Sequence, residues 1–176
     1  MYEAFWAAVT LIGDPVVWAG AVATLTVLYF AMGKGYVRFG NVRKNRHMLK
    51  KFLLLVIPAI MVSLLGSEAL KLVFQVPRPC IPCPAEGCNI YCPPTFSFPS
   101  AHSATTAGIA TALFLLLRKR KYALIYVFPL LIAASRVALD VHTVPDVVGG
   151  FFVGLLLTLL VWRYRKRIYR WEDEIL

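Results

Sequence analysis

Reactive side chains are concentrated in one short segment of the C-terminal half, between two stretches apolar enough to cross a bilayer. These side chains are Arg136, Asp140, His142 and Asp146. Charged groups at membrane depth are costly, so such a cluster indicates a functional site with specific partners. A simpler interpretation is a solvated loop in which Arg136 pairs with Asp140 one helical turn later. Thr143 and Asp146 would then form a capping box that opens the next helix.

Two further motifs lie at the ends of other apolar segments. Lys71 and Arg78, with six residues between them, close one segment. Pro99, Ser100 and His102 lie at the start of another. A serine N-cap after Pro99 directs free N–H groups and the positive end of the helix dipole outward, which favours binding of an anion.

The three motifs together resemble the signature motifs of the type 2 phosphatidic acid phosphatase superfamily, which are integral-membrane lipid phosphate phosphatases. The order and internal spacings match in Lys71-x6-Arg78-Pro79, Pro99-Ser100-Ala101-His102 and Ser135-Arg136-x5-His142-x3-Asp146. The resemblance covers residues 71 to 146. One position departs from the family pattern, because Ala101 stands where the family usually has glycine. The backbone N–H is kept, and a methyl group is added beside the expected phosphate.

The resemblance implies the catalytic roles. His142 would be the nucleophile that forms a phosphohistidine, and Asp146 would orient it through the other ring nitrogen. His102 would be the general acid for the leaving group and later the base that activates water. The third histidine, His47, lies in a basic loop far from the motifs.

The remaining motif residues suit phosphate binding. Cations would clamp the nonbridging oxygens, and hydroxyl and amide donors would stabilise the transferred charge without a metal or another cofactor. The expected phosphate-binding residues are Lys71, Arg78, Ser100, Ala101 and Arg136. Two further residues, Glu68 and Ser135, are expected to support them. Glu68 would neutralise Lys71 or reach Arg136, or else extend to water.

The composition is that of a membrane protein. Of the 176 residues 59% are hydrophobic and only 16% are charged, and the mean hydropathy is +0.68. We expect a single all-α domain over residues 1–176, a polytopic transmembrane bundle of about five spans. The spans are predicted at 15–33, 52–75, 100–117, 121–139 and 143–162.

The distribution of positive charge predicts the orientation of the chain. Of the 19 lysines and arginines, 16 lie in the first loop, the turn at 118–121 and the tail at 163–176. The positive-inside rule makes this side cytoplasmic, where these loops are expected to contact anionic lipid headgroups. The remaining three are Lys71, Arg78 and Arg136, so the site is predicted on the external face of the cell membrane. Nucleic-acid binding is excluded because the cations follow membrane boundaries.

The N-terminal residues are expected to form a short external helix. Residues 1–12 are apolar and aromatic, and Gly13-Asp14-Pro15 is a turn signal. The helix would be interfacial or re-entrant, and the alternative is one long tilted first span. A cleaved signal peptide is not expected, because the first residues lack a basic region.

Four cysteines lie in the external loop at 76–99, at positions Cys80, Cys83, Cys88 and Cys92. Four thiolates could hold zinc, or the thiols could stay reduced. An even number of cysteines on an oxidising side favours two disulfides, whose pairing the sequence does not determine.

The expected activity is hydrolysis of a lipid phosphate or diphosphate that enters laterally from the membrane. The resemblance implies polyprenyl diphosphate, phosphatidic acid or phosphatidylglycerol phosphate as substrate, and three cations favour the diphosphate. One alternative is a lipid phosphotransferase with the same residues. Another is a non-catalytic protein that binds or transports lipid phosphates, although binding alone would not require His102, His142 and Asp146.

Overall fold

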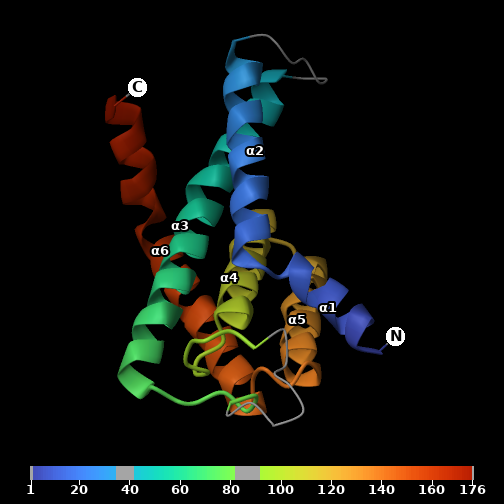
Figure 1. Ribbon diagram of the computed structural model, residues 1–176. Coiled ribbons are helices and arrows are strands. Elements are labelled where there is room, and N and C mark those ends of the chain that lie inside the picture. Colours follow the sequence, from blue (N-terminus) through green and yellow to red (C-terminus); the bar gives the residue numbers. More distant parts are fainter. Residues whose placement is uncertain (1, 35–41, 82–91, 176) are drawn as a thin grey trace.

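The computed structural model describes residues 2–34, 42–81 and 92–175, and within these ranges the chain forms helices and loops without strands. The fold is the predicted all-α bundle (Figure 1). Its elements are α1 (Tyr2–Ile12), α2 (Pro15–Gly33), α3 (Val42–Phe74), α4 (Ala101–Leu117), η1 (Arg120–Tyr126), α5 (Val127–Ala138) and α6 (Val144–Ile175).

Four of the predicted spans correspond to segments long and apolar enough to cross a membrane, as expected of a membrane protein. They are Pro15–Met32, His47–Phe74, Arg120–Ala138 and Val144–Arg165. The predicted span at 100–117 is the 17-residue helix α4, which at 1.5 Å per residue is slightly shorter than the ~30 Å hydrocarbon core. The predicted span at 121–139 begins as a 3₁₀ helix, η1, before α5 continues it.

Helix α4 lies in the centre of the bundle, in contact with α3, α5 and α6. Its small side chains are buried almost without interruption from Ala101 to Ala112. Two glycines of α6 allow the closest approach. A Cβ atom at Gly150 would collide with the carbonyl oxygen of Ser100, and one at Gly154 with that of Ala104. Small residues therefore bring the two backbones together, as in other membrane helix pairs.

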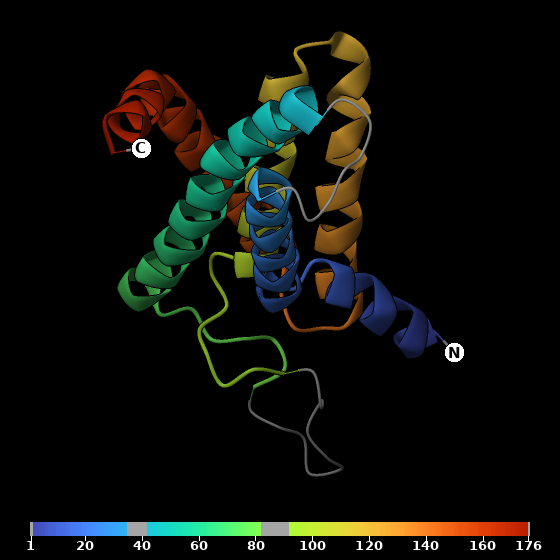
Figure 2. The same ribbon diagram turned by 90° about the horizontal axis from the view of Figure 1, so that it is seen from above.

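The N-terminal segment is a separate helix and not part of one long first span. A turn at Gly13 and Asp14 ends α1, and the indole of Trp18 donates to the carbonyl of Ile12 across it at 2.8 Å. Helix α1 then packs against α5 (Figures 1 and 2). The buried Gly13 fits there because a Cβ atom would lie 2.6 Å from the side chain of Ile132.

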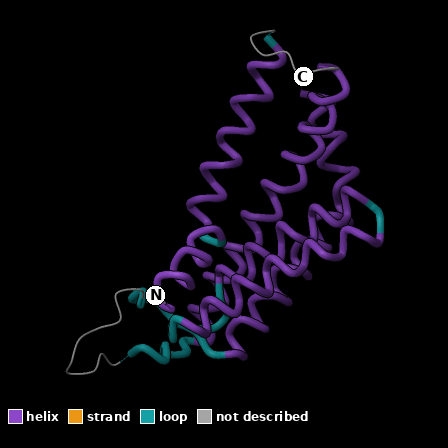
Figure 3. The backbone as a smooth tube through the Cα atoms, turned by 90° about the vertical axis from the view of Figure 1, so that its right-hand side faces the viewer, coloured by secondary structure: helices purple, strands orange, loops and turns teal. Residues whose placement is uncertain are grey.

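The loops that carry the motifs gather at one end of the bundle. The connections before α4 and between α5 and α6 lie at the lower end in Figure 1, whereas the C-terminus lies at the upper end. Figure 3 shows most of the loop residues together at that same end. The fold thus brings together motifs from three separate parts of the chain.

Candidate active site

Arg78 is fixed by the loop that precedes α4. Its side chain is buried, with 3% of its surface exposed. Its Nε donates to the carbonyl of Thr95 at 2.7 Å and its Nη2 to the Thr95 hydroxyl at 2.9 Å. Its Nη1 donates to the carbonyl of Val141 at 2.9 Å and lies 3.0 Å from Nε2 of His142. These contacts aim the guanidinium at the histidine ring.

His142 lies in the loop between α5 and α6, and its other nitrogen faces Asp146. The Nδ1 atom is 3.6 Å from Oδ2 of Asp146 and 3.3 Å from the hydroxyl of Ser97. The Ser97 hydroxyl donates to the same Oδ2 at 2.5 Å. The backbone N–H of Thr143 donates to it as well, at 2.7 Å. The carboxylate therefore accepts the bond expected of a capping box and also faces the histidine, so the capping bond and the contact with His142 coexist, whereas His142 and Asp146 are buried and not solvated.

The ring of His142 is neutral over the usual pH range. Burial, and after it the positive charges of Arg78 and Arg136, lower its pKa from 6.5 to about 2. Because the guanidinium of Arg78 can only donate, Nε2 of His142 is the acceptor and Nδ1 carries the proton. The nitrogen without a proton thus faces the cation, where an anionic group would bind.

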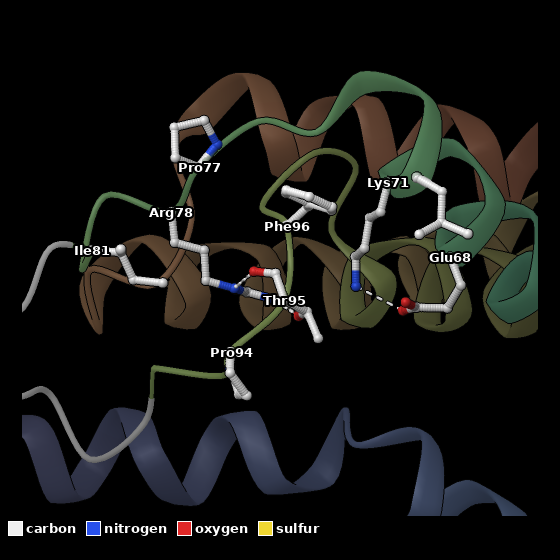
Figure 4. A pocket seen from close by; sticks show the side chains of 9 residues that line it. Glu68, Lys71, Pro77, Arg78, Ile81, Pro94, Thr95 and Phe96 are labelled. Carbon is white, nitrogen blue, oxygen red and sulfur yellow. Dashed lines mark hydrogen bonds and ion pairs between the residues drawn. The ribbon is translucent and has the colours of Figure 1, made fainter.

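Lys71, in the last turn of α3, forms an ion pair with Glu68 at 2.6 Å. The expected neutralisation of Lys71 is therefore observed, whereas no contact between Glu68 and Arg136 is seen among the described residues. Lys71 and Arg78 line one pocket with a volume of about 540 Å³ (Figure 4). Its other lining residues are Glu68, Leu72, Pro77, Ile81, Pro94, Thr95 and Phe96.

Ser100 occupies the N-cap position of α4 without a side-chain capping bond. Its hydroxyl oxygen is buried and makes no hydrogen bond within the described protein, and the same is true of the Ser103 hydroxyl. The Ser100 N–H donates to the carbonyl of Asp146 at 2.9 Å, which fixes the start of α4 against the start of α6. The free N–H groups of the first turn of α4, starting at Ala101, point toward the same end of the bundle.

Arg136 is buried in the last turn of α5, with 4% of its surface exposed. Its Nη1 donates to the hydroxyl of Thr10 in α1 at 3.0 Å, and its Nε makes no hydrogen bond within the described protein. The alternative pairing of Arg136 with Asp140 is not seen among the described residues, and Asp140 is exposed in the following turn. The hydroxyl of Ser135 donates to the carbonyl of Ile132, so its hydrogen bond stays within α5.

His102 faces Asp14, the residue that caps α2. Its Nε2 lies 3.7 Å from Oδ2 of that carboxylate. His102 also lies within electrostatic range of Lys71, Arg78 and Arg136. The structure thus brings both predicted catalytic histidines and all three predicted cations to one site.

The cysteine loop contains a disulfide between Cys80 and Cys92, with a Cα–Cα distance of 6.2 Å. This pair confirms the expectation of a disulfide. It links the two arms of the loop, one of which carries Arg78 and the other Thr95. Cys83 and Cys88 lie outside the described residues. Within the described part of the chain, no group of three or more His, Cys, Asp or Glu side chains is arranged to hold a metal ion.

Four polar residues of the site were not predicted from the sequence: Thr10, Asp14, Thr95 and Ser97. Asp14 was interpreted only as part of a turn. Ser97 lies in an aromatic and proline-rich stretch without a recognisable spacing. Each reaches the site through tertiary contacts, so no periodicity or motif in the sequence indicates them.

Comparisons with known proteins agree with this geometry. A family model described as the PAP2 superfamily matches residues 52–170. The chain is 41% identical over 90 residues to phosphatidylglycerophosphatase B of Bacillus subtilis (strain 168), a match that covers 46% of this chain and 44% of the relative. It is 31% identical over 115 residues to sphingosine-1-phosphate phosphatase 1 of Mus musculus, covering 61% of this chain and 26% of the relative. The chain thus spans less than half the length of these relatives.

Two solved structures share the fold. The crystal structure of Aquifex aeolicus LpxE superposes with a TM-score of 0.68 at 24% identity, over 92% of this chain and 86% of that one. That of the first transmembrane PAP2 type phosphatidylglycerolphosphate phosphatase from Bacillus subtilis gives a TM-score of 0.65 at 24% identity, over 94% and 77%. The family match covers the three motifs and most of the bundle, and the chain belongs to the PAP2 superfamily.

Proposed function

We propose that this protein is a membrane phosphatase that hydrolyses a lipid phosphate or diphosphate through a phosphohistidine on His142. The observation that carries the proposal is the position of His142 between Arg78 at 3.0 Å and Asp146 at 3.6 Å. The imidazole of His142 is buried and neutral, and Asp146 orients it from the Nδ1 side. The guanidinium of Arg78 on the Nε2 side would bind the phosphate oxygens, so Nε2 would face the phosphorus atom that it attacks.

In the first step, Nε2 of His142 attacks phosphorus and the bond from phosphorus to the leaving oxygen breaks. Protonated His102 donates its proton to that oxygen, so the leaving group departs as an alcohol or as a monophosphate. The growing positive charge on the His142 ring is stabilised by the carboxylate of Asp146 on the Nδ1 side.

In the second step, neutral His102 takes a proton from water while the water oxygen attacks phosphorus. The bond between phosphorus and Nε2 of His142 breaks, and inorganic phosphate leaves. His142 is neutral again and His102 is protonated again, so the cycle closes with one water consumed.

Positively charged and neutral hydrogen-bond donors would hold the three nonbridging oxygens of the transferred phosphoryl group during both steps. Lys71, Arg78 and Arg136 supply the charge, and the arginines suit bidentate contacts. Two buried side-chain donors without a partner in the described protein supply the rest, the hydroxyl of Ser100 and Nε of Arg136. The first N–H groups of α4, including that of Ala101, have no partner within the helix and would add to them. Such preorganised donors stabilise the charge of the transferred group.

The pocket in Figure 4 supports a lipid substrate. Two cations, Lys71 and Arg78, lie in its wall, and most of the other lining residues are apolar, such as Leu72, Ile81 and Phe96. A phosphate at the cations would leave an acyl or prenyl chain against apolar side chains near the membrane, so we infer lateral entry. The names of both curated relatives describe phosphatases of lipid phosphates. We favour a polyprenyl diphosphate because three cations suit a multiply charged headgroup.

The proposed reaction takes place at the external face of the membrane. The support is the distribution of charge, because 16 of the 19 lysines and arginines lie in the first loop, the turn at 118–121 and the tail, whereas the other three belong to the motifs. Those basic segments are proposed to contact anionic lipid headgroups at the cytoplasmic face.

The test is release of phosphate by the purified protein in detergent with EDTA present, from prenyl diphosphates, glycerolipid phosphates and soluble phosphate esters. We expect release from the lipids that disappears in His142→Ala and persists in His47→Ala, which removes an exposed histidine. Protein denatured at alkaline pH during turnover should carry a phosphate that acid then releases, in the wild type only. Absence of release from every substrate would refute the proposed function.

A further inference from the structure

The last turn of α1 and the turn that joins it to α2 contact the site, although both precede the residues 52–170 matched by the family model. Each contributes one polar side chain. Thr10 accepts a hydrogen bond from Arg136 at 3.0 Å, and the carboxylate of Asp14 lies 3.7 Å from Nε2 of His102. The same short segment thus contacts a proposed phosphate-binding residue and the proposed general acid.

Asp14 is held in place by the local structure. Its Oδ1 accepts from the N–H of Val16 at 2.7 Å, which caps α2, so Oδ2 is the oxygen directed at His102. Its own N–H donates to the carbonyl of Leu11 at 3.1 Å. The neighbouring Gly13 packs on Ile132 of α5 without room for a side chain. The carboxylate therefore cannot leave the site without disturbing the cap.

The charges around His102 explain what Asp14 contributes. Lys71 from α3, Arg78 from the following loop and Arg136 from α5 all act on His102 as positive charges. Asp14 is the carboxylate that opposes them among the described groups that act on this ring. A general acid must be protonated when the leaving group departs, and both the burial of the ring and the three nearby cations disfavour the protonated form.

We propose that Asp14 is a positioning residue that orients His102 for proton transfer and favours its protonated form. This inference rests on the proposed function. The separation of 3.7 Å is that of an ion pair and not of a direct hydrogen bond. With Nε2 of His102 directed at Asp14, Nδ1 is the nitrogen that gives its proton to the leaving oxygen and later takes one from water.

The kinetic test compares Asp14→Asn with Asp14→Ala. Asparagine keeps an oxygen for the α2 cap and removes the charge, whereas alanine removes both. We expect Asp14→Asn to lower kcat by about tenfold, a part of the 10²–10⁴ that general acid catalysis contributes, with KM within about twofold. The alkaline limb of its pH profile should move to lower pH. Glu3→Gln removes an exposed carboxylate from the same segment and should leave kcat and the profile unchanged.

A second readout does not depend on turnover. The protein contains three histidines, so ¹⁵N-labelled imidazole signals can be assigned with His47→Gln and His142→Gln. We expect Asp14→Asn to move the titration midpoint of His102 down by about one pH unit, the effect of an opposite charge within 4–6 Å.

The two readouts separate the two proposals. If the wild type releases no phosphate, the proposed function is wrong, and the titration still decides whether Asp14 acts on His102. If Asp14→Asn keeps the wild-type kcat and the wild-type midpoint, while Asp14→Ala only unfolds at a lower temperature, Asp14 is a helix cap and the inference is wrong.

Discussion

Nη1 of Arg78 lies 3.0 Å from Nε2 of His142, so a cation that can only donate faces the nitrogen proposed to attack phosphorus. The contact fixes the tautomer of His142 and places the guanidinium where the phosphate oxygens must lie. An incoming phosphate would take over the N–H donors of Arg78 and release the electron pair of Nε2. Binding of the phosphate by Arg78 would therefore also expose Nε2 of His142 for attack.

This arrangement predicts that lysine cannot replace Arg78. Arg78→Lys keeps the charge but loses the planar guanidinium, whose three nitrogens contact the Thr95 carbonyl, the Thr95 hydroxyl and His142 at the same time. We expect kcat/KM for phosphate release to fall by about 100-fold, or ~2.7 kcal/mol of transition-state stabilisation. Arg118→Lys, an exposed residue at the other end of α4, should retain full activity. Wild-type activity in Arg78→Lys would contradict the geometry.

The buried ring of His142 predicts a pH dependence of stability. Burial, followed by the charges of Arg78 and Arg136, lowers the pKa of His142 from 6.5 to about 2. Below pH 6.5 the unfolded chain therefore binds a proton that the folded chain does not. This contribution to stability is complete above pH 6.5 and is lost as the pH falls toward 2.

The check is a comparison of Tm against pH, between pH 4 and 8, for the wild type and His142→Gln in detergent. The Tm of the wild type should fall more steeply below pH 6.5 than that of the variant. The difference between the two curves isolates His142, because the other titrating groups are common to both. Parallel curves would mean that His142 gains its proton over the same pH range in the folded and the unfolded protein, and would contradict the lowered pKa.

Ser97 is predicted to matter for rate although no motif indicates it. Its hydroxyl donates to Asp146 at 2.5 Å and lies 3.3 Å from Nδ1 of His142. A hydrogen bond to a charged group contributes about 1.5–3 kcal/mol, so Ser97→Ala should lower kcat roughly tenfold or more. Thr24→Ala removes an exposed hydroxyl that bonds only its own helix, at the carbonyl of Gly20, and serves as the matched control. Equal kcat values for both variants would exclude a role of Ser97 in orienting Asp146.

The motif residues could be predicted from the sequence because local rules determine where they lie. A cation or histidine at the end of an apolar span must lie at a membrane boundary, and alternating spans bring every second boundary to the same side. Thr10 and Arg136 are 126 residues apart in the chain, and their contact depends on how α1 packs against α5. Asp14 likewise has a complete local role as the cap of α2. Its second role requires the position of α4, which no local pattern indicates.

The disulfide between Cys80 and Cys92 is predicted to support the position of Arg78. It joins the two arms of the loop next to the bonds between Arg78 and Thr95. Replacing both cysteines by serine should raise KM and lower stability by about 3 kcal/mol, the usual entropy effect for a loop of this size. The matched control is the double serine variant of Cys83 and Cys88, which keeps the described bridge and should keep the wild-type KM. If this control raises KM and the Cys80 and Cys92 variant does not, the support comes from elsewhere in the loop.

Gly154 is predicted to be intolerant of any side chain, because α6 and α4 touch through their backbones there. A Cβ atom at this position would collide with the carbonyl of Ala104, a backbone atom that cannot rotate away. We expect Gly154→Ala to lower the Tm in detergent, with a cost of about 1–3 kcal/mol for overpacking.

The matched control is Gly20 in α2, which has no atom within 4 Å of the corresponding position. Gly20→Ala should therefore change stability by less than about 1 kcal/mol. A shift of α4 would also displace Ser100 and His102, so the Gly154→Ala protein should lose activity at temperatures below its Tm. Equal Tm and equal activity of the Gly154→Ala and Gly20→Ala proteins would show that α4 and α6 are not in close contact.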